Sequence, residues 1–299
     1  MRQILLIAAL LLAITPLTAL NAGMLQTELE RYISDCGATV GAAVITDQGD
    51  TIAINNNARY PLNSVMKLHQ AMAVIAKADR YRIPLDSMLT IQYAELQTDT
   101  WSPMRDKYGC GEQRCLQISL SSIIEYSVQQ SDNNACDILF DRIVTIADTD
   151  SYIRRLGITD FAIAVNEFMM HQDNSLAASN WSTPVAAAAL IHKLFNEQLF
   201  SKDYNDFLLN TLTGCSTGMK RLPSPLPSGA IIGHKTGTGF DDEAGHPMGI
   251  NDVGFIRLAD GNSYAIAVFV DRCHTDMDGA ERIISDISSI VADNMVNNR

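Results

Sequence analysis

The sequence is poor in basic residues and has no cluster of them. Its 22 Lys and Arg stand against 34 Asp and Glu, which gives a formal net charge of −12. Because basic side chains supply much of the affinity for nucleic acid, this balance argues against a nucleic-acid partner. Internal repeats and low-complexity linkers are also missing, and 47% hydrophobic with 19% charged residues is typical of a globular protein. A chain of 299 residues with this composition can bury a large core.

A long apolar run occurs only at the start of the chain. Basic Met1-Arg2-Gln3 precedes the apolar segment from Ile4 to Ile14, which is closed by Thr15-Pro16 and followed by small residues up to Ala22. This order is typical of a secretory signal peptide, so we predict a signal over 1–22 and export to the periplasm or the medium. An uncleaved membrane anchor is the alternative, although the run is short for a span. We expect no membrane association after the signal is removed, because no later segment is long and apolar enough.

Pairs of cysteines with the spacing of a metal site are absent. Six cysteines in an exported protein make disulfides allowable, and Cys110 and Cys115 could close the short loop between them. Cys136 lies in an apolar helical stretch, which predicts a buried free thiol. The polar residues at 271–276 include Cys, His and Asp, but we interpret them as a loop and predict no metal.

Apolar residues recur with a helical period in the middle of the chain and with strand character near both ends. Strand-like runs are expected at 38–45, 51–54, 230–234, 252–258 and 263–270. Helical spacing occurs at 24–35, 64–80, 119–128, 133–146, 150–156, 184–199 and 279–295. We therefore predict one α+β unit whose sheet comes from 23–60 and 214–299, around an all-helical part at 61–213. The stretch 160–182 has little periodicity, and a loop of that length is usually functional.

Ser64 and Lys67 form the motif around which we expect the site to be built. An apolar run of helical period follows Ser64, so its hydroxyl should lie near a helix N-terminus, where developing negative charge is favoured. Lys67 lies one turn further on the same face, and a lysine shielded from water can take the proton of a serine. Alone the motif is weak, because Ser-x-x-Lys arises by chance about once in a chain of this length.

Two tripeptides accompany this motif. Ser131-Asp132-Asn133 falls between two predicted helices, and Lys235-Thr236-Gly237 ends a predicted strand. Each alone could be a helix cap or an ordinary strand end. Finding both in this order after Ser-x-x-Lys is expected in only about one random chain in a thousand. The combination is the known signature of class A β-lactamases and penicillin-binding proteins.

The chain resembles the class A serine β-lactamases over essentially its whole mature length. It is most similar to the extended-spectrum branch that contains the PER, VEB and CfxA-type enzymes. The stretches that carry this likeness are Thr100–Pro103, Ser131–Asn133, Cys136-Asp137, Asn180-Trp181 and Asn251–Gly254. The resemblance implies the fold shared with penicillin-binding proteins, an antiparallel five-stranded sheet with flanking helices and an inserted all-helical subdomain. It also implies a monomer that needs no cofactor and acts on a small β-lactam.

The resemblance implies a chemical role for each residue of the signature. Ser64 would attack the lactam carbonyl, and the backbone N–H groups of Ser64 and Thr238 would bind the oxyanion. Lys67 would take the proton of Ser64, and Ser131 would pass a proton to the departing ring nitrogen. Lys235 would supply positive charge toward Ser131 and the substrate carboxylate.

The same likeness implies the residues that bind substrate. Thr236, Thr238 and Arg221 would hold the carboxylate, because Arg221 stands where this branch has its carboxylate-binding arginine. Asn133 would bind the acylamido group, and Trp101 would lie at the mouth of the site.

Glu167 distinguishes two functions that share the signature. Rapid hydrolysis needs a base that aims water at the acyl ester, and Glu167 matches the family's deacylating residue by its distance from Ser131 and by the following segment 180–184. Four residues later, His171 replaces the asparagine that helps to hold this water in most of the family, as it does in the PER and VEB branch. Either Lys67 or Glu167, acting through water, could be the base for acylation.

Three other functions remain open. A penicillin-binding protein or D,D-peptidase would form the same acyl-enzyme with peptidoglycan stem peptides but release it slowly. A non-catalytic β-lactam sensor would usually be tethered to a membrane domain, and a serine glutaminase shares the fold. Sustained β-lactam turnover that depends on Glu167 separates hydrolysis from all three.

The resemblance also bears on the cysteines. The family's usual disulfide starts from the nucleophile helix, where this chain has Ala71, so that bond is absent. In the family fold Cys36 and Cys273 would lie near the ends of neighbouring antiparallel strands. We therefore predict a bond between these two residues.

Overall fold

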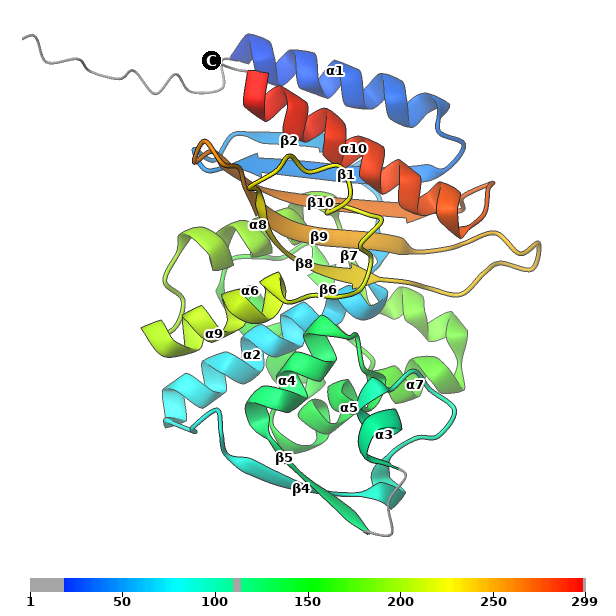
Figure 1. Cartoon of the computed structure of the whole chain (residues 1–299). Helices are drawn as coiled ribbons and strands as arrows, with labels where there is room; N and C mark the ends of the chain where they lie inside the picture. Colours follow the sequence, from blue (N-terminus) through cyan, green and yellow to red (C-terminus); the bar gives the residue numbers. More distant parts are fainter. Residues whose placement is uncertain (1–18, 110–113, 298–299) are drawn as a thin grey trace, which may run out of the picture.

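The computed structural model describes residues 19–109 and 114–297. One half of the molecule is built on a five-stranded sheet with the strand order β2-β1-β10-β9-β8, in which all paired strands are antiparallel (Figure 1). Its strands are β1 (Thr39–Thr46), β2 (Thr51–Ile54), β8 (Ile231–Gly237), β9 (Ile250–Arg257) and β10 (Ser263–Asp271). Segments from near both ends of the chain are neighbours in this sheet, since β1 pairs with β10 in a register that sets Thr39 opposite Asp271. The predicted α+β fold with a five-stranded antiparallel sheet is confirmed.

Helices cover both faces of this sheet. The two terminal helices, α1 (Ala19–Asp35) and α10 (Met277–Asn297), lie side by side on one face, and α8 (Pro184–Asn196) packs on the other (Figure 1). Successive residues of β10 point to opposite faces, so Ile266 and Val268 join the core under the terminal helices while Ala267 joins the core under α8. Burial on both faces explains why the strands are almost continuously apolar.

The other half is organised around α2 (Met66–Tyr81). This helix is buried along most of its length, and its buried residues include the polar Lys67, His69 and Gln70. The helices of this half besides α2 are α3 (Pro103–Tyr108), α4 (Leu120–Gln129), α5 (Asn133–Arg142), α6 (Ile146–Arg155), α7 (Glu167–Gln172) and α9 (Lys202–Thr213). Figure 1 shows β8 as the sheet strand nearest to α2, so the two halves meet along β8.

The prediction that the inserted part is all-helical was wrong in two places. Two strands, β4 (Met88–Gln92) and β5 (Cys115–Ser119), form an antiparallel pair. Three two-residue strands, β3 (Tyr60–Pro61), β7 (Trp181–Ser182) and β6 (Phe161–Ala162), form a second small sheet. In β5 the buried residues Leu116 and Ile118 alternate with more exposed ones. This alternation covers only five residues between predicted helices, so it did not predict a strand.

The stretch 160–182 also holds more structure than its weak periodicity predicted. It contains α7 and a 3-10 helix, η3 (Asn174–Ser179), which are too short to produce a visible period. The predicted helix 133–146 ends at Arg142, and α6 begins after Thr145, whose hydroxyl and the Asp148 carboxylate form a reciprocal capping box.

The predicted bond between Cys36 and Cys273 was wrong, because both are free thiols. The Cys36 sulfur donates to the Ile33 carbonyl oxygen at 3.1 Å, and the Cys273 sulfur lies 3.2 Å from the Thr275 hydroxyl. Each sulfur therefore has a local partner of its own. Cys136 is a free thiol with no exposed surface, as predicted.

The remaining predictions concern residues outside the described part or features absent from it. Cys110 and most of the predicted signal lie at 110–113 and 1–18, which are not described. Within 19–109 and 114–297, no helix combines the length and apolarity that a membrane span requires. The same residues contain no group of three or more His, Cys, Asp or Glu side chains arranged to hold a metal.

Candidate active site

The three motifs meet at one cavity of about 450 Å³ between the helical half and β8. Most of the predicted site residues line it, namely Ser64, Trp101, Ser131, Asn133, Glu167, His171, Arg221, Thr236 and Thr238. The remaining two, Lys67 and Lys235, have no exposed surface and reach the cavity wall only with their amines. The structure thus brings together all the residues that the sequence singled out.

Ser64 lies in a tight turn that its neighbours hold in place. The turn is a 3-10 segment, η1 (Asn63–Val65), and α2 begins just after it, two residues later than predicted. Asn63 has a left-handed φ of 47°, a conformation that asparagine tolerates better than most residues. Its side-chain amide donates to the Gly249 carbonyl oxygen at 2.8 Å. A Cβ on Gly249 would lie only 2.3 Å from that amide nitrogen, so the contact requires glycine there.

The Lys67 amine contacts four oxygen atoms on the helical side of the cavity. Its Nζ lies 2.8 Å from the Ser64 hydroxyl, 2.8 Å from the Glu167 carboxylate, 2.8 Å from the Ser131 carbonyl oxygen and 2.7 Å from Asn133 Oδ1. An ammonium has three N–H groups, so it can donate to only three of these four acceptors at one time. The fourth acceptor needs a hydrogen bond from another donor. The Ser64 hydroxyl can supply it, because its oxygen is 3.3 Å from Glu167 Oε1.

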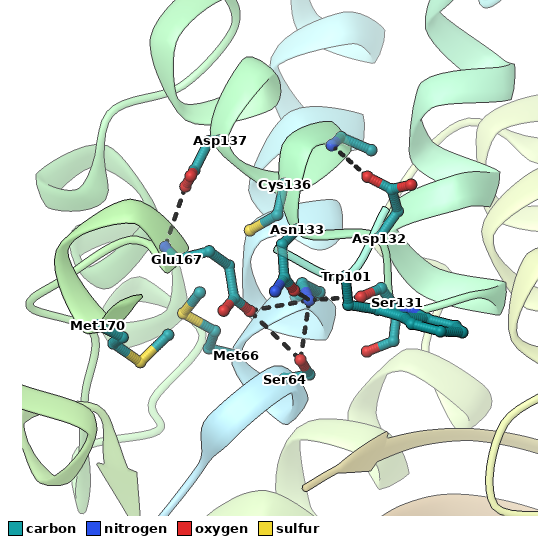
Figure 2. A network of polar contacts seen from close by, with 12 residues as sticks. Ser64, Met66, Trp101, Ser131, Asp132, Asn133, Cys136, Asp137, Glu167 and Met170 are labelled. Atoms are coloured by element: carbon teal, nitrogen blue, oxygen red, sulfur yellow. Dashed lines mark hydrogen bonds and ion pairs between the residues drawn. The ribbon is translucent and has the colours of Figure 1, made fainter. Parts of the chain in front are cut away.

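Glu167 is aimed at Ser64 by the first turn of α7. The Asp137 carboxylate accepts hydrogen bonds from the backbone N–H of Glu167 at 3.0 Å and of Phe168 at 2.9 Å, satisfying two donors that every helix start leaves free. Figure 2 shows the Glu167 carboxylate turned toward Ser64 and Asp137 at its backbone nitrogen. Burial, with the nearby Glu167 charge, raises the pKa of Asp137 to about 7. Asp137 was not predicted as a site residue and entered only through the family likeness; its position four residues after Asn133 on one helix face was the available signal.

Ser131 connects the two sides of the cavity. Its backbone φ of 59° is left-handed, and its carbonyl oxygen accepts from Lys67 while its hydroxyl accepts from Lys235 Nζ at 2.9 Å. The next residue, Asp132, is fully buried and caps α5 by accepting from the Ala135 N–H at 2.8 Å. Burial lowers the pKa of Lys235 to about 7, and the Lys67 charge acts in the same direction.

Arg221 is almost completely engaged by the protein. One terminal nitrogen donates to the carbonyl oxygens of Gly237 and Asn251, each at 2.9 Å, and Nε pairs with Glu281 at 3.1 Å. The other terminal nitrogen donates to the Thr238 hydroxyl at 2.8 Å. Arg221 therefore contributes charge to the cavity and orients Thr238, with few donors left for a ligand.

The rim of the cavity carries exposed side chains from both halves. Trp101 is 61% exposed and donates from its ring nitrogen to the Gln130 carbonyl oxygen at 2.9 Å. His171 lines the cavity and its Nε2 lies 2.9 Å from the Asp99 carboxylate. Phe240, which is 52% exposed, also lines the cavity and was not predicted, since nothing in its local sequence marks it.

Comparison with known proteins gives a consistent result. The family model described as the beta-lactamase enzyme family matches residues 24–295. A β-lactamase of Bacteroides uniformis is 38% identical over 283 residues, 94% of each chain. The extended-spectrum β-lactamase PER-1 of Pseudomonas aeruginosa is 32% identical over 272 residues, 91% of this chain and 87% of that one. The crystal structure of a class A β-lactamase from Bacteroides cellulosilyticus superposes with a TM-score of 0.88 at 35% identity, covering 93% and 99% of the chains.

Proposed function

The chain belongs to the β-lactamase enzyme family, and on that premise we propose that it hydrolyses the β-lactam amide through an acyl-enzyme on Ser64. Glu167 then assists the release of the acyl group. The observation that carries this proposal is the 3.3 Å contact between the Glu167 carboxylate and the Ser64 hydroxyl. Acylation alone does not need such a carboxylate, whereas rapid hydrolysis of an ester needs a base that can activate water.

Acylation begins when Ser64 loses its proton as its oxygen attacks the lactam carbonyl. Both Lys67 and Glu167 contact that hydroxyl. The Glu167 carboxylate can accept the proton directly, and Lys67 can accept it once its ammonium has passed a proton to Glu167, 2.8 Å away. The C–N bond then breaks, and the ring nitrogen takes a proton from the Ser131 hydroxyl. The proton that Ser64 released is passed on to Ser131, so that Lys67, Glu167 and Ser131 all return to their starting protonation states. Lys235, 2.9 Å from that hydroxyl, stabilises the negative charge that develops on it.

The oxyanion of the tetrahedral intermediate is held by the backbone N–H groups of Ser64 and Thr238. This assignment is supported by the close approach of the end of β8 to the nucleophile's turn. A Cβ on Gly237 would lie only 2.5 Å from the Leu62 carbonyl oxygen, so glycine is needed for the two segments to come together. Two preorganised donors of this kind typically contribute about 3–4 kcal/mol each to the transition state.

Deacylation uses the same carboxylate with a water molecule. The start of α7 is fixed by the hydrogen bonds that the N–H groups of Glu167 and Phe168 donate to Asp137, so the Glu167 side chain needs little reorganisation once the ester has formed. Glu167 takes a proton from water, the hydroxide attacks the ester carbonyl, and the proton returns to the Ser64 oxygen as the acid product leaves.

The substrates are penicillins and cephalosporins, recognised by their carboxylate and acylamido groups. The hydroxyls of Thr236 and Thr238 bind the carboxylate in a region made positive by Lys235 and Arg221. The amide of Asn133 contacts the acylamido group. Likeness to the extended-spectrum PER-1 enzyme supports activity on oxyimino-cephalosporins, and the signal-like segment at 1–22 supports export.

Steady-state hydrolysis by the purified chain from Gly23 to Arg299 tests this function. A penicillin, an early cephalosporin and an oxyimino-cephalosporin are assayed with the wild type and with Ser64→Ala as the matched control. We expect sustained turnover of all three by the wild type and none by the variant. A single stoichiometric burst with nitrocefin in the wild type would instead support a penicillin-binding protein, and binding without acylation would support a sensor.

A further inference from the structure

A second cluster of titratable side chains lies behind the Lys235–Thr236 segment. His234 Nδ1 is 2.8 Å from the Asp252 carboxylate, and these residues are 2% and 0% exposed. The Cys215 thiol, on a buried residue, interacts electrostatically with His234. None of the three lines the cavity or takes part in the reaction proposed above.

Hydrogen bonds connect this cluster to the cavity. The Cys215 sulfur lies 3.4 Å from the Thr217 hydroxyl, which in turn lies 2.6 Å from the Thr236 hydroxyl, and in each contact either atom can donate. Thr217 and Thr236 both line the cavity. A Cβ on Gly218 would lie 2.5 Å from the Thr236 side chain, so this segment is packed too tightly to slide away. The chain of contacts therefore runs from Cys215 to the cavity surface, with His234 and Asp252 behind Cys215.

We propose that Cys215 is a positioning residue for the substrate carboxylate, because through Thr217 it determines whether the Thr236 hydroxyl is free to donate to the substrate. This inference rests on the proposed role of Thr236. Each hydroxyl has only one proton to donate. A thiolate at Cys215 draws the Thr217 proton, Thr217 then accepts from Thr236, and the Thr236 proton is turned away from the cavity. When the sulfur is protonated, Thr217 can donate to Thr236, whose own proton is then free for the carboxylate.

The groups around Cys215 act in opposite directions on the equilibrium between its thiol and its thiolate. The charged groups that face it are His234 and Lys235 on β8, with Asp252 on β9 behind His234. Burial alone raises the pKa of Cys215, but the interaction with the neighbouring His234 outweighs it and lowers the pKa to about 7. Burial lowers the pKa of His234, and the Asp252 charge more than compensates and raises it to about 10. Binding of an anionic carboxylate and ionisation of the thiol therefore oppose each other.

Cys215→Ser tests this coupling because its hydroxyl keeps the hydrogen bonds but does not ionise at these pH values. KM and kcat are measured at about pH 6 and about pH 8.5, for a cephalosporin and for the methyl ester of its carboxylate. At the higher pH we expect the KM for the acid to be about 3- to 10-fold lower in the variant than in the wild type, with kcat unchanged. We expect no difference at the lower pH, and none for the ester at either pH.

Thr217→Val gives an independent measurement, because it breaks the contact chain between Cys215 and Thr236 while Cys215, His234 and Asp252 all remain in place. From the lower to the higher pH, the KM of the wild type for the acid should rise, and the KM of Thr217→Val should rise less. In this background Cys215→Ser should have no further effect on KM.

Other results would overturn the inference. A thiolate also favours the positive charge of Lys235, so if that effect were dominant Cys215→Ser would raise the KM for the acid at the higher pH. An equal or higher KM, or an equal change for acid and ester, therefore contradicts the proposed coupling. A wild type that hydrolyses neither compound would instead contradict the proposed function.

Discussion

The two walls of the cavity hold their charged groups in different ways. On the helical wall, Lys67 and Glu167 both contact the Ser64 hydroxyl and each other. On the sheet wall, Arg221 is fixed by backbone carbonyl oxygens and Glu281, and Lys235 by the Thr236 carbonyl oxygen and Ser131. Groups that share contacts around one hydroxyl can exchange protons, whereas groups held by backbone carbonyl oxygens supply positive charge from a fixed position.

This contrast predicts a division of labour between the walls. Substitutions on the helical wall should act mainly on kcat, since proton transfers occur there in the proposed mechanism. Substitutions on the sheet wall should act mainly on KM, because fixed charge binds the carboxylate in the ground state as well as in the transition state. Ser131, whose carbonyl oxygen contacts one wall and whose hydroxyl contacts the other, should affect both constants.

The largest effect is expected for Ser64→Ala on the helical wall. Removing the nucleophile should lower kcat/KM by about 10⁴-fold or more, while binding of substrate remains because the sheet wall is untouched. Equilibrium binding of a β-lactam to the variant, measured by calorimetry, checks the second half of this expectation. Retention of more than about a tenth of the activity would show that another group attacks the lactam.

Glu167→Ala should follow in magnitude. We expect kcat to fall about 10²- to 10⁴-fold, with a rapid burst of one equivalent, because acylation can continue through Lys67 while water is no longer activated. Stopped-flow absorbance with nitrocefin separates the burst from the steady state. Loss of the burst along with turnover would mean that Glu167 is also essential for acylation.

Lys235→Ala should show the opposite balance on the sheet wall. A hydrogen bond to a charged group contributes about 1.5–3 kcal/mol, so KM for a carboxylate-bearing substrate should rise about 10- to 100-fold. The change in kcat should be several-fold smaller. The methyl ester of the same substrate is the matched comparison, and an equal rise in its KM would remove Lys235 from carboxylate recognition.

The smallest effect is expected for Asp137→Asn, which tests how the helical wall is held. The two N–H groups at the start of α7 bond different oxygens of Asp137, and asparagine offers only one acceptor oxygen, so we expect a loss of about 1–2 kcal/mol in the free energy of unfolding. Turnover should also fall, because Glu167 is then less firmly oriented. Denaturant unfolding and steady-state kinetics on the same preparations measure both effects.

The stability difference for Asp137→Asn should also depend on pH. The pKa of Asp137 is raised from 3.8 to about 7 in the folded state, so the folded chain binds more protons than the unfolded chain in this window. The contribution of this group to stability therefore falls as pH rises from about 4 to about 7 and stays low above that. The variant lacks this titration, so its deficit should shrink with rising pH. A constant deficit would contradict the raised pKa.

Features encoded by neighbouring residues were predictable from the sequence. The strands near both chain ends have continuous apolar runs, which predict them directly. Ser64 and Lys67 are one helical turn apart, so the helical period was sufficient to predict that they lie together. The start of α7 depends on Asp137, thirty residues earlier in the chain, and no local pattern encodes that contact. The partners of Arg221 lie on β8, β9 and α10, and its near-complete engagement was likewise not predictable.

Mass spectrometry of the quenched Glu167→Ala enzyme tests the central claim, that Glu167 releases an ester formed on Ser64. After mixing with a β-lactam, the intact protein should gain the mass of one whole substrate molecule, and peptide mapping should locate that mass on Ser64. The wild type, quenched at the same time, should be almost unmodified because its ester turns over. A stable adduct on wild type and variant alike, or an adduct on another residue, would contradict the account.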